Sequence, residues 1–245
     1  MQANCGLEML RLSADLLGET RVIHPTLIWD EDNVILVDTG YPGQWPMLRE
    51  AVQAAGVQAE RINRVVLTHQ DVDHIGALPQ LLAETPHPVE VSAHSLEMPY
   101  IQGEKPLLRF TAEALAEIET WPEAFSSAFK RLIANPPKAA VDRTLADGDR
   151  LPYGGGLVVI ETTGHTPGHI SLYHPSSKTL IAGDALTAAG DRLLGPDPRS
   201  TLEPAAALQS LRRLASYDIE TVICYHGGLY RGDANRRIAE LANGG

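Results

Sequence analysis

The chain has 245 residues, of which 44% are hydrophobic and 21% are charged, and this ordinary balance predicts a globular protein and excludes long disordered tracts. Its formal net charge of -11 repels phosphate backbones, so we expect no nucleic-acid partner. Five basic residues in the middle of the chain are expected to form a solvated helix face. They are Lys105, Arg109, Lys130, Arg131 and Lys138.

The N-terminal sequence MQANCGLEMLRLSADL lacks a basic start followed by a long apolar stretch, so no signal peptide is predicted. No run reaches the roughly 18 apolar residues that a membrane helix needs. Two cysteines, Cys5 and Cys224, are too few for a disulfide scaffold and are typical of a reducing compartment. We therefore expect a cytoplasmic protein without a membrane partner, in which Cys224 is a buried small hydrophobe.

The first part of the chain alternates strands with helices, which is typical of an α/β fold. Two apolar runs flank the polar cluster Glu31-Asp32-Asn33 and predict a β-hairpin, and a helical pattern that follows ends at Gly56, a typical helix C-cap. The expected elements are strands at 26–29, 33–37, 64–67 and 89–92, and helices at 44–55 and around Leu78, Leu81 and Leu82.

Residues from about 95 to 140 differ in character, because their apolar side chains follow helical spacing between prolines. These side chains are Leu115, Ile118, Trp121, Phe125, Phe129 and Leu132. They predict a helical insertion in one domain that spans residues 1–245, and the insertion is either a substrate wall or plain scaffold. The β pattern then resumes, with strands expected at 156–161, 179–182 and 221–225 and helices near 204–217 and 233–241.

Five apolar runs end in an aspartate or a histidine, and small residues flank several of these ends. The five residues are Asp38, His69, His165, Asp184 and His226. Polar groups at the ends of rigid strands are well placed to build a site, because the strands aim the side chains.

The densest cluster of polar residues is His69-Gln70-Asp71-Val72-Asp73-His74, between two apolar flanks. Unpaired buried carboxylates are costly, and a divalent cation would neutralise them. Imidazole and carboxylate ligands together suit zinc, manganese or iron. The cluster therefore predicts a metal site.

Five sequence blocks, LVDTG, LTHQDVDHIG, TTGHTPGHISL, IAGDAL and YHGG, occur in this order along nearly the whole chain. Together they resemble the blocks of the metallo-β-lactamase fold superfamily, in particular its single-domain bacterial hydrolases. The resemblance implies an α/β fold, a four-layer αβ/βα sandwich of two similar halves with metal ions at one edge between the sheets.

The resemblance also implies a role for each polar residue. A first metal ion would be bound by His69, Asp71 and His165, a second by Asp73, His74 and His226, and both by Asp184, while Asp38 and His169 would support the ligands without binding metal.

Asp71 departs from the usual superfamily block, His-x-His-x-Asp-His, in which the second position is histidine. A carboxylate adds negative charge and a hard oxygen ligand, which favours manganese or iron over zinc. Flavodiiron oxidoreductases carry glutamate and some DNA-uptake proteins carry aspartate at this position. Two divalent ions are expected, with zinc as the first choice and manganese or iron as alternatives.

The function expected from these residues is hydrolysis of an ester, thioester, lactone or phosphoester bond in a small molecule by a metal-bound hydroxide. Asp73 would also carry the proton to the leaving group. Two alternatives stay open: a di-iron oxidoreductase, for which the chain has no room for a flavodoxin module, and a non-catalytic metal-binding domain. The substrate and the oligomeric state stay open as well.

Overall fold

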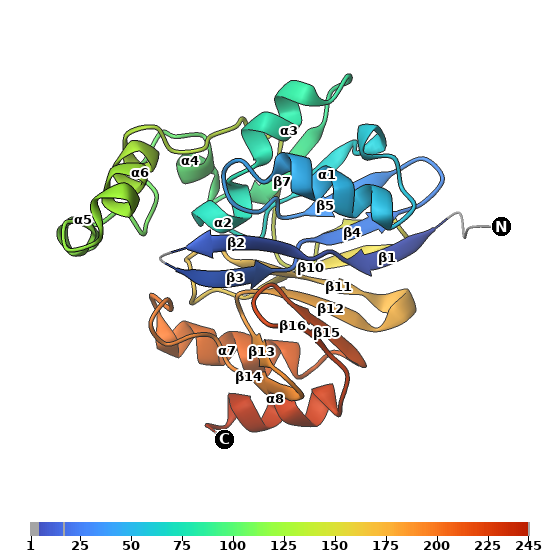
Figure 1. The fold of residues 1–245 in the computed structure, drawn as a ribbon. Coiled ribbons are helices and arrows are strands. Elements are labelled where there is room, and N and C mark those ends of the chain that lie inside the picture. The colour runs from blue at the N-terminus through green and yellow to red at the C-terminus, as the bar shows by residue number, and fades with distance from the viewer. Residues whose placement is uncertain (1–4, 17, 245) are drawn as a thin grey trace.

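Two six-stranded β-sheets stack face to face, and helices cover the outer face of each sheet (Figure 1). The structure is a computed structural model that describes residues 5–16 and 18–244. Apolar side chains from both sheets, among them Ile28, Val66, Val159 and Leu172, form the buried layer between them. The order helix, sheet, sheet, helix is the four-layer αβ/βα sandwich that the resemblance implies, so the predicted fold class is confirmed.

The first sheet contains the predicted hairpin, in which Thr26 pairs with Val37. The next strands run parallel, so their carboxyl ends meet at one edge of the sheet. The strands in spatial order are β1 (Gly6–Met9), β4 (Thr26–Trp29), β5 (Val34–Val37), β6 (Arg64–Val66), β7 (Glu90–His94) and β8 (Arg143–Leu145). Its outer face is covered by α1 (Trp45–Ala54) and α3 (Leu78–Glu84), and η1 (Ala59–Arg61) and α2 (Val72–Ile75) lie in the connections.

The second sheet repeats this plan with the C-terminal half of the chain. Its strands in spatial order are β16 (Gly228–Tyr230), β15 (Thr221–Cys224), β12 (Thr179–Gly183), β11 (Ile170–His174), β10 (Leu157–Glu161) and β9 (Arg150–Leu151). Its outer face is covered by α7 (Pro204–Leu214) and α8 (Ala234–Ala242), and η2 (Pro175–Ser177) joins β11 to β12. Strands β12 and β15 are parallel and β10 runs in the same direction, so all three end at the same edge.

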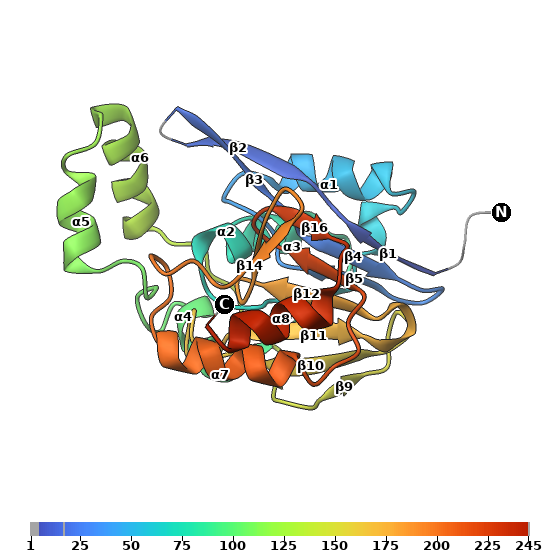
Figure 2. The ribbon, with the colours of Figure 1, turned by 90° about the horizontal axis from the view of Figure 1, so that it is seen from below.

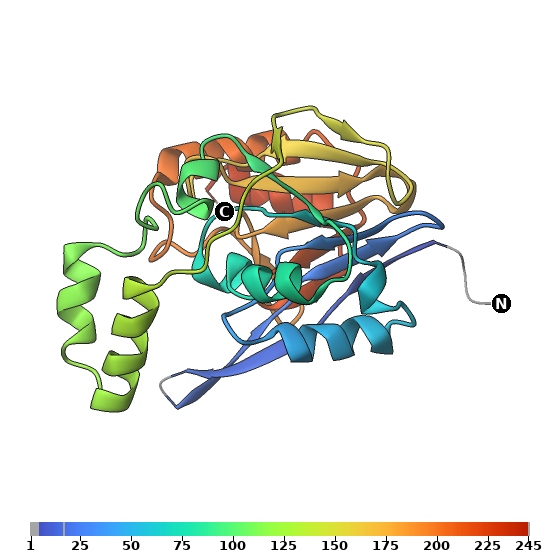
Figure 3. The same ribbon diagram turned by 90° about the horizontal axis from the view of Figure 1, so that it is seen from above.

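Two further hairpins and a group of helices complete the molecule. The hairpins are β2 (Leu12–Leu16) with β3 (Glu19–Ile23) and β13 (Thr187–Ala189) with β14 (Arg192–Leu194), and the helices are α4 (Met98–Ile101), α5 (Ala112–Ile118) and α6 (Glu123–Ala134). Helices α5 and α6 stand clear of the sandwich, and the β2–β3 hairpin extends toward the same end of the molecule (Figures 2 and 3).

The predicted helical stretch between about 95 and 140 is divided at Pro122, which lies between α5 and α6. The residue before a proline is held away from the helical conformation, so one continuous helix cannot form there.

Cys224 is fully buried and Cys5 is exposed, and neither forms a disulfide. The burial of Cys224 confirms its predicted role as a small hydrophobe. Across residues 5–16 and 18–244, none of the helices has the length and apolar character needed to cross a membrane. Residues 1–4, where the sequence predicts no signal peptide, lie outside the described part of the chain.

Candidate metal centre

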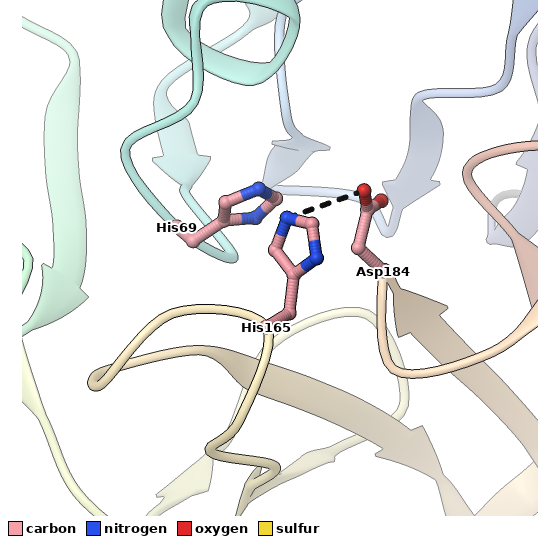
Figure 4. A group of neighbouring side chains, drawn as sticks. All are labelled: His69, His165 and Asp184. Carbon is pink, nitrogen blue, oxygen red and sulfur yellow. Dashed lines mark ion pairs between the residues drawn. The ribbon is translucent and has the colours of Figure 1, made fainter. Parts of the chain in front are cut away.

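The polar residues predicted to form the site converge from both sheets. His69 follows β6, and His165, Asp184 and His226 follow β10, β12 and β15. Ligand atoms of His69, His165 and Asp184 all lie within 4.8 Å of one another, and so do those of a second group, Asp73, His74 and His226. Figure 4 shows the first group, in which the three side chains come from separate loops and face a common space.

Asp184 lies between the two groups. Its Oδ2 is 3.5 Å from His165 Nε2, the contact drawn as a dashed line in Figure 4, and 3.4 Å from His226 Nε2. Its Oδ1 is 3.3 Å from His74 Nε2. In the second group, His226 Nε2 is 3.2 Å from Asp73 Oδ2. One carboxylate therefore faces imidazoles of both groups.

Several polar atoms in this centre are buried without a hydrogen-bond partner. Among residues 5–16 and 18–244, no partner is found for Nε2 of His69, Nε2 of His74 or Oδ1 of Asp184. A buried polar atom without a partner costs roughly 1–3 kcal/mol, and native proteins seldom tolerate several together. Imidazole nitrogens and carboxylate oxygens are the usual ligands of divalent transition-metal ions, so the donor set fits a metal centre.

The charges of the centre reinforce one another. Burial by itself would raise the pKa of Asp184, but the charges of His226, His74 and His165 outweigh it and hold that pKa well below its usual range. Burial would lower the pKa of His226, but Asp184 and Asp73 raise it to about 10. The carboxylates are therefore held ionised, the state in which they can bind a cation.

Asp38 orients His74 from behind the centre. Its Oδ2 accepts hydrogen bonds from His74 Nδ1 and from Thr68 Oγ1, both at 2.8 Å, which leaves His74 Nε2 directed at Asp184. Asp38 adopts a left-handed conformation with a φ of 62°, an uncommon geometry for a residue other than glycine. Tyr225 stacks on the His74 ring at 3.8 Å, and its hydroxyl donates to the Asp73 carbonyl.

His169 holds the backbone of Asp184. Its Nε2 accepts the Asp184 N–H at 2.9 Å, and its Nδ1 lies 2.8 Å from Thr162 Oγ1. Burial and the charge of His69 lower the pKa of His169 well below its usual range, so the ring is neutral and can accept this bond. Both ring nitrogens are engaged, and His169 lies beside the first group.

Asp71 contacts the first group and also Arg109, which the sequence predicts on a solvated helix face. Its Oδ2 lies 3.1 Å from His165 Nε2 and 3.4 Å from His69 Nε2, and it accepts a bond from Arg109 Nε at 2.9 Å. Arg109 Nη2 also donates to His165 Nε2 at 3.0 Å. The prediction that Arg109 lies on a solvated helix face is wrong, because this buried carboxylate draws the guanidinium inward.

Glu97 is a second residue that the sequence reasoning missed. This fully buried carboxylate accepts the Gln70 N–H at 3.0 Å and the Gly168 N–H at 2.7 Å. Gln70 adjoins His69, and Gly168 adjoins His169. Glu97 thus ties the two loops of the first group together, although no local motif marks it.

We expect Glu97→Gln to lower the free energy of unfolding by about 1–3 kcal/mol, because an amide nitrogen would face one of the two backbone donors. Metal affinity should fall by roughly 10–100-fold. Denaturant unfolding and metal titration would measure both. The exposed Glu104, in the same segment, offers a matched control, and equal behaviour of Glu97→Gln and Glu104→Gln would contradict the role.

Comparison with known proteins identifies the family. A model of the metallo-beta-lactamase superfamily matches residues 19–226. The chain belongs to the metallo-beta-lactamase superfamily. A superfamily member named probable metallo-hydrolase YflN, from Bacillus subtilis, is 30% identical over 231 residues, which are 85% of this chain and 81% of that relative.

Two further proteins are similar to this chain, one in sequence and one in structure. A hydroxyacylglutathione hydrolase from Fuscovulum blasticum is 30% identical over 198 residues, which are 79% of this chain but only 58% of that enzyme. A metallo-beta-lactamase family protein from Thermus thermophilus has a similar structure, with a TM-score of 0.73 at 24% identity, covering 98% of this chain and 79% of that protein. The structural similarity supports the fold.

Proposed function

We propose that this chain is a metal-dependent hydrolase that cleaves an ester, thioester, lactone or phosphoester bond of a small molecule at a binuclear centre. The observation that carries the proposal is Asp184, whose carboxylate faces imidazoles of both groups, while polar atoms of His69, His74 and Asp184 itself are buried without a hydrogen-bond partner. Relatives named probable metallo-hydrolase and hydroxyacylglutathione hydrolase support the same reaction type.

The proposed ligands follow the two groups around Asp184. A first ion would be held by His69, His165 and Asp71, a second by Asp73, His74 and His226, and both by Asp184. Zinc is the first choice and manganese or iron the alternatives, because Asp71 adds a hard oxygen ligand. The ligands come from both halves of residues 1–245, which we propose act as one domain.

Divalent ions held in such a centre would lower the pKa of water toward neutrality and stabilise negative charge on the substrate. The protein contributes orientation and proton transfer. Asp73 lines the cavity beside the centre and lies 3.2 Å from His226, so its carboxylate is placed to carry a proton to the leaving group. Asp38 holds the His74 ring in its orientation, and His169 holds the backbone of Asp184.

Removing and restoring the metal tests the proposal. After chelation with verified metal loss, the protein should no longer hydrolyse model esters, thioesters, lactones and phosphodiesters. The thermal midpoint should fall by roughly 5–11 °C when the starting protein is held at a metal concentration of about a hundred times Kd. Added zinc, manganese or iron should restore both. Undiminished hydrolysis in metal-free protein would refute the proposal, and so would a loaded protein that hydrolyses nothing.

A further inference from the structure

A cavity of about 540 Å³ lies beside the candidate metal centre. Its inner end is formed by Asp71 and Asp73, which belong to the ligand-bearing loop and α2. Its outer wall comes from α6, which Figures 1 and 3 show extending beyond the sandwich, and from Phe110 before α5 and Trp121 before α6. A volume of this size is typical of a site for a small organic molecule.

The outer wall is apolar and largely aromatic. It is formed by Phe110, Trp121, Phe125, Phe129 and Leu132. The rings of Phe110 and Trp121 both meet Phe129 edge to face, at centroid distances of 6.2 Å and 5.4 Å. Such contacts hold the rings in place, so the wall has a defined shape before any ligand arrives.

This wall leaves apolar surface open toward solvent. The side chain of Phe125 is 37% exposed, although exposure of a large aromatic group carries an unfavourable hydration free energy. Apolar surface next to a polar centre is typical of a ligand site, in which the apolar part binds and the polar groups orient the reacting atoms.

The outer wall offers no charged partner to a ligand. The single cation among the lining residues, Arg109, already donates hydrogen bonds to Asp71 and His165. A substrate portion that carries carboxylates would lose hydration against this wall without gaining a cationic partner, so the wall favours an uncharged apolar group.

We infer that this cavity binds an apolar alkyl or aryl group of the substrate, so that the hydrolase proposed above acts on esters, thioesters or lactones with an apolar chain beside the scissile bond. This inference rests on the proposed function. The apolar group can belong to the acyl side or to the leaving-group side of the bond, and substrates varied on one side at a time distinguish the two.

The test measures kcat/KM of the metal-loaded enzyme along two ester series. One series extends the acyl chain of p-nitrophenyl esters from acetate to octanoate, and the other extends the alkyl thiol of thioacetate esters. In one series kcat/KM should rise about fourfold per methylene until the cavity is filled, because each buried methylene contributes about 0.8 kcal/mol. Equal values along both series would overturn the inference.

Variants of the wall give the matched comparison. Phe129→Ala should flatten the chain-length dependence. Ala128→Phe, which fills the cavity from α6, should lower kcat/KM for octanoate far more than for acetate. Leu115→Ala is the control, because Leu115 lies on α5, is 38% exposed and is absent from the lining. Equal effects of Phe129→Ala and Leu115→Ala would contradict the assignment.

A binding measurement separates this inference from the proposed function. Titration with octanamide, an uncharged apolar probe, should change the fluorescence of Trp121 in the unmodified protein and leave Trp121→Phe unaffected. Saturable binding without hydrolysis of any ester would refute the hydrolase and keep the apolar site. Hydrolysis of acetate without octanamide binding and without chain-length dependence would refute the apolar site and keep the hydrolase.

Discussion

Asp184→Ala is expected to abolish most hydrolysis and to release at least one metal ion per chain. The carboxylate lies within 3.5 Å of imidazoles from both groups, namely His165, His226 and His74. Without it, Asp71 remains beside His165 and Asp73 beside His226, but no carboxylate joins the two groups. The loss of kcat/KM should exceed the roughly 100-fold that removal of a supporting group costs, because a shared ligand positions both ions.

Metal analysis and steady-state kinetics measure this effect together. Asp184→Asn keeps the shape of the side chain and removes its charge, so it should lose metal while retaining the fold. Asp191→Ala removes the same charge from the exposed turn between β13 and β14 and should leave metal content and kcat/KM unchanged. Full turnover with unchanged metal content in Asp184→Ala would refute the bridging role.

The sequence predicts the positions of the ligand groups because each follows an apolar strand. His69, Asp184 and His226 come directly after runs of buried side chains, and parallel strands bring such ends to one edge of a sheet. The β4–β5 hairpin is predicted for a similar reason, since the turn signal at Glu31–Asn33 is local. Signals within about ten residues were enough for these features.

The contacts that join the two halves have no such local signal. Glu97 holds loops at Gln70 and Gly168 that are separated by almost a hundred positions, and Arg109 reaches Asp71 across 38 positions. Arginines on a helical stretch usually face solvent, so periodicity and charge assign Arg109 to the surface. The cavity wall also has no local signal, because its aromatic residues follow helical spacing whether they pack as scaffold or line a site.

The Asp71–Arg109 pair is expected to control metal affinity at the first ligand group. Burial would raise the pKa of Asp71, but the charges of His69 and Arg109 outweigh it and hold that pKa well below its usual range. Arg109 also donates to His165 Nε2, a proposed ligand atom. A metal ion bound there must therefore displace the guanidinium from His165 and tolerate its positive charge nearby.

Arg109→Gln should tighten binding of the first ion on the order of a hundredfold, because it removes a positive charge that repels the ion. Two unit charges about 4 Å apart interact by about 4 kcal/mol at an effective dielectric constant of 20, and solvent around this half-buried arginine weakens that repulsion. Asp71→His alone should weaken binding, since it leaves the Arg109 charge beside three imidazoles. The double change should restore affinity and shift preference from manganese or iron toward zinc. Competition titrations against a chelating dye, combined as a double-mutant cycle, measure the coupling between Asp71 and Arg109.

The contradicting outcome comes from Asp71→Asn. If this variant leaves metal content, metal preference and the pH dependence of kcat unchanged, Asp71 binds no metal. Arg109→Gln should then alter stability without altering metal affinity.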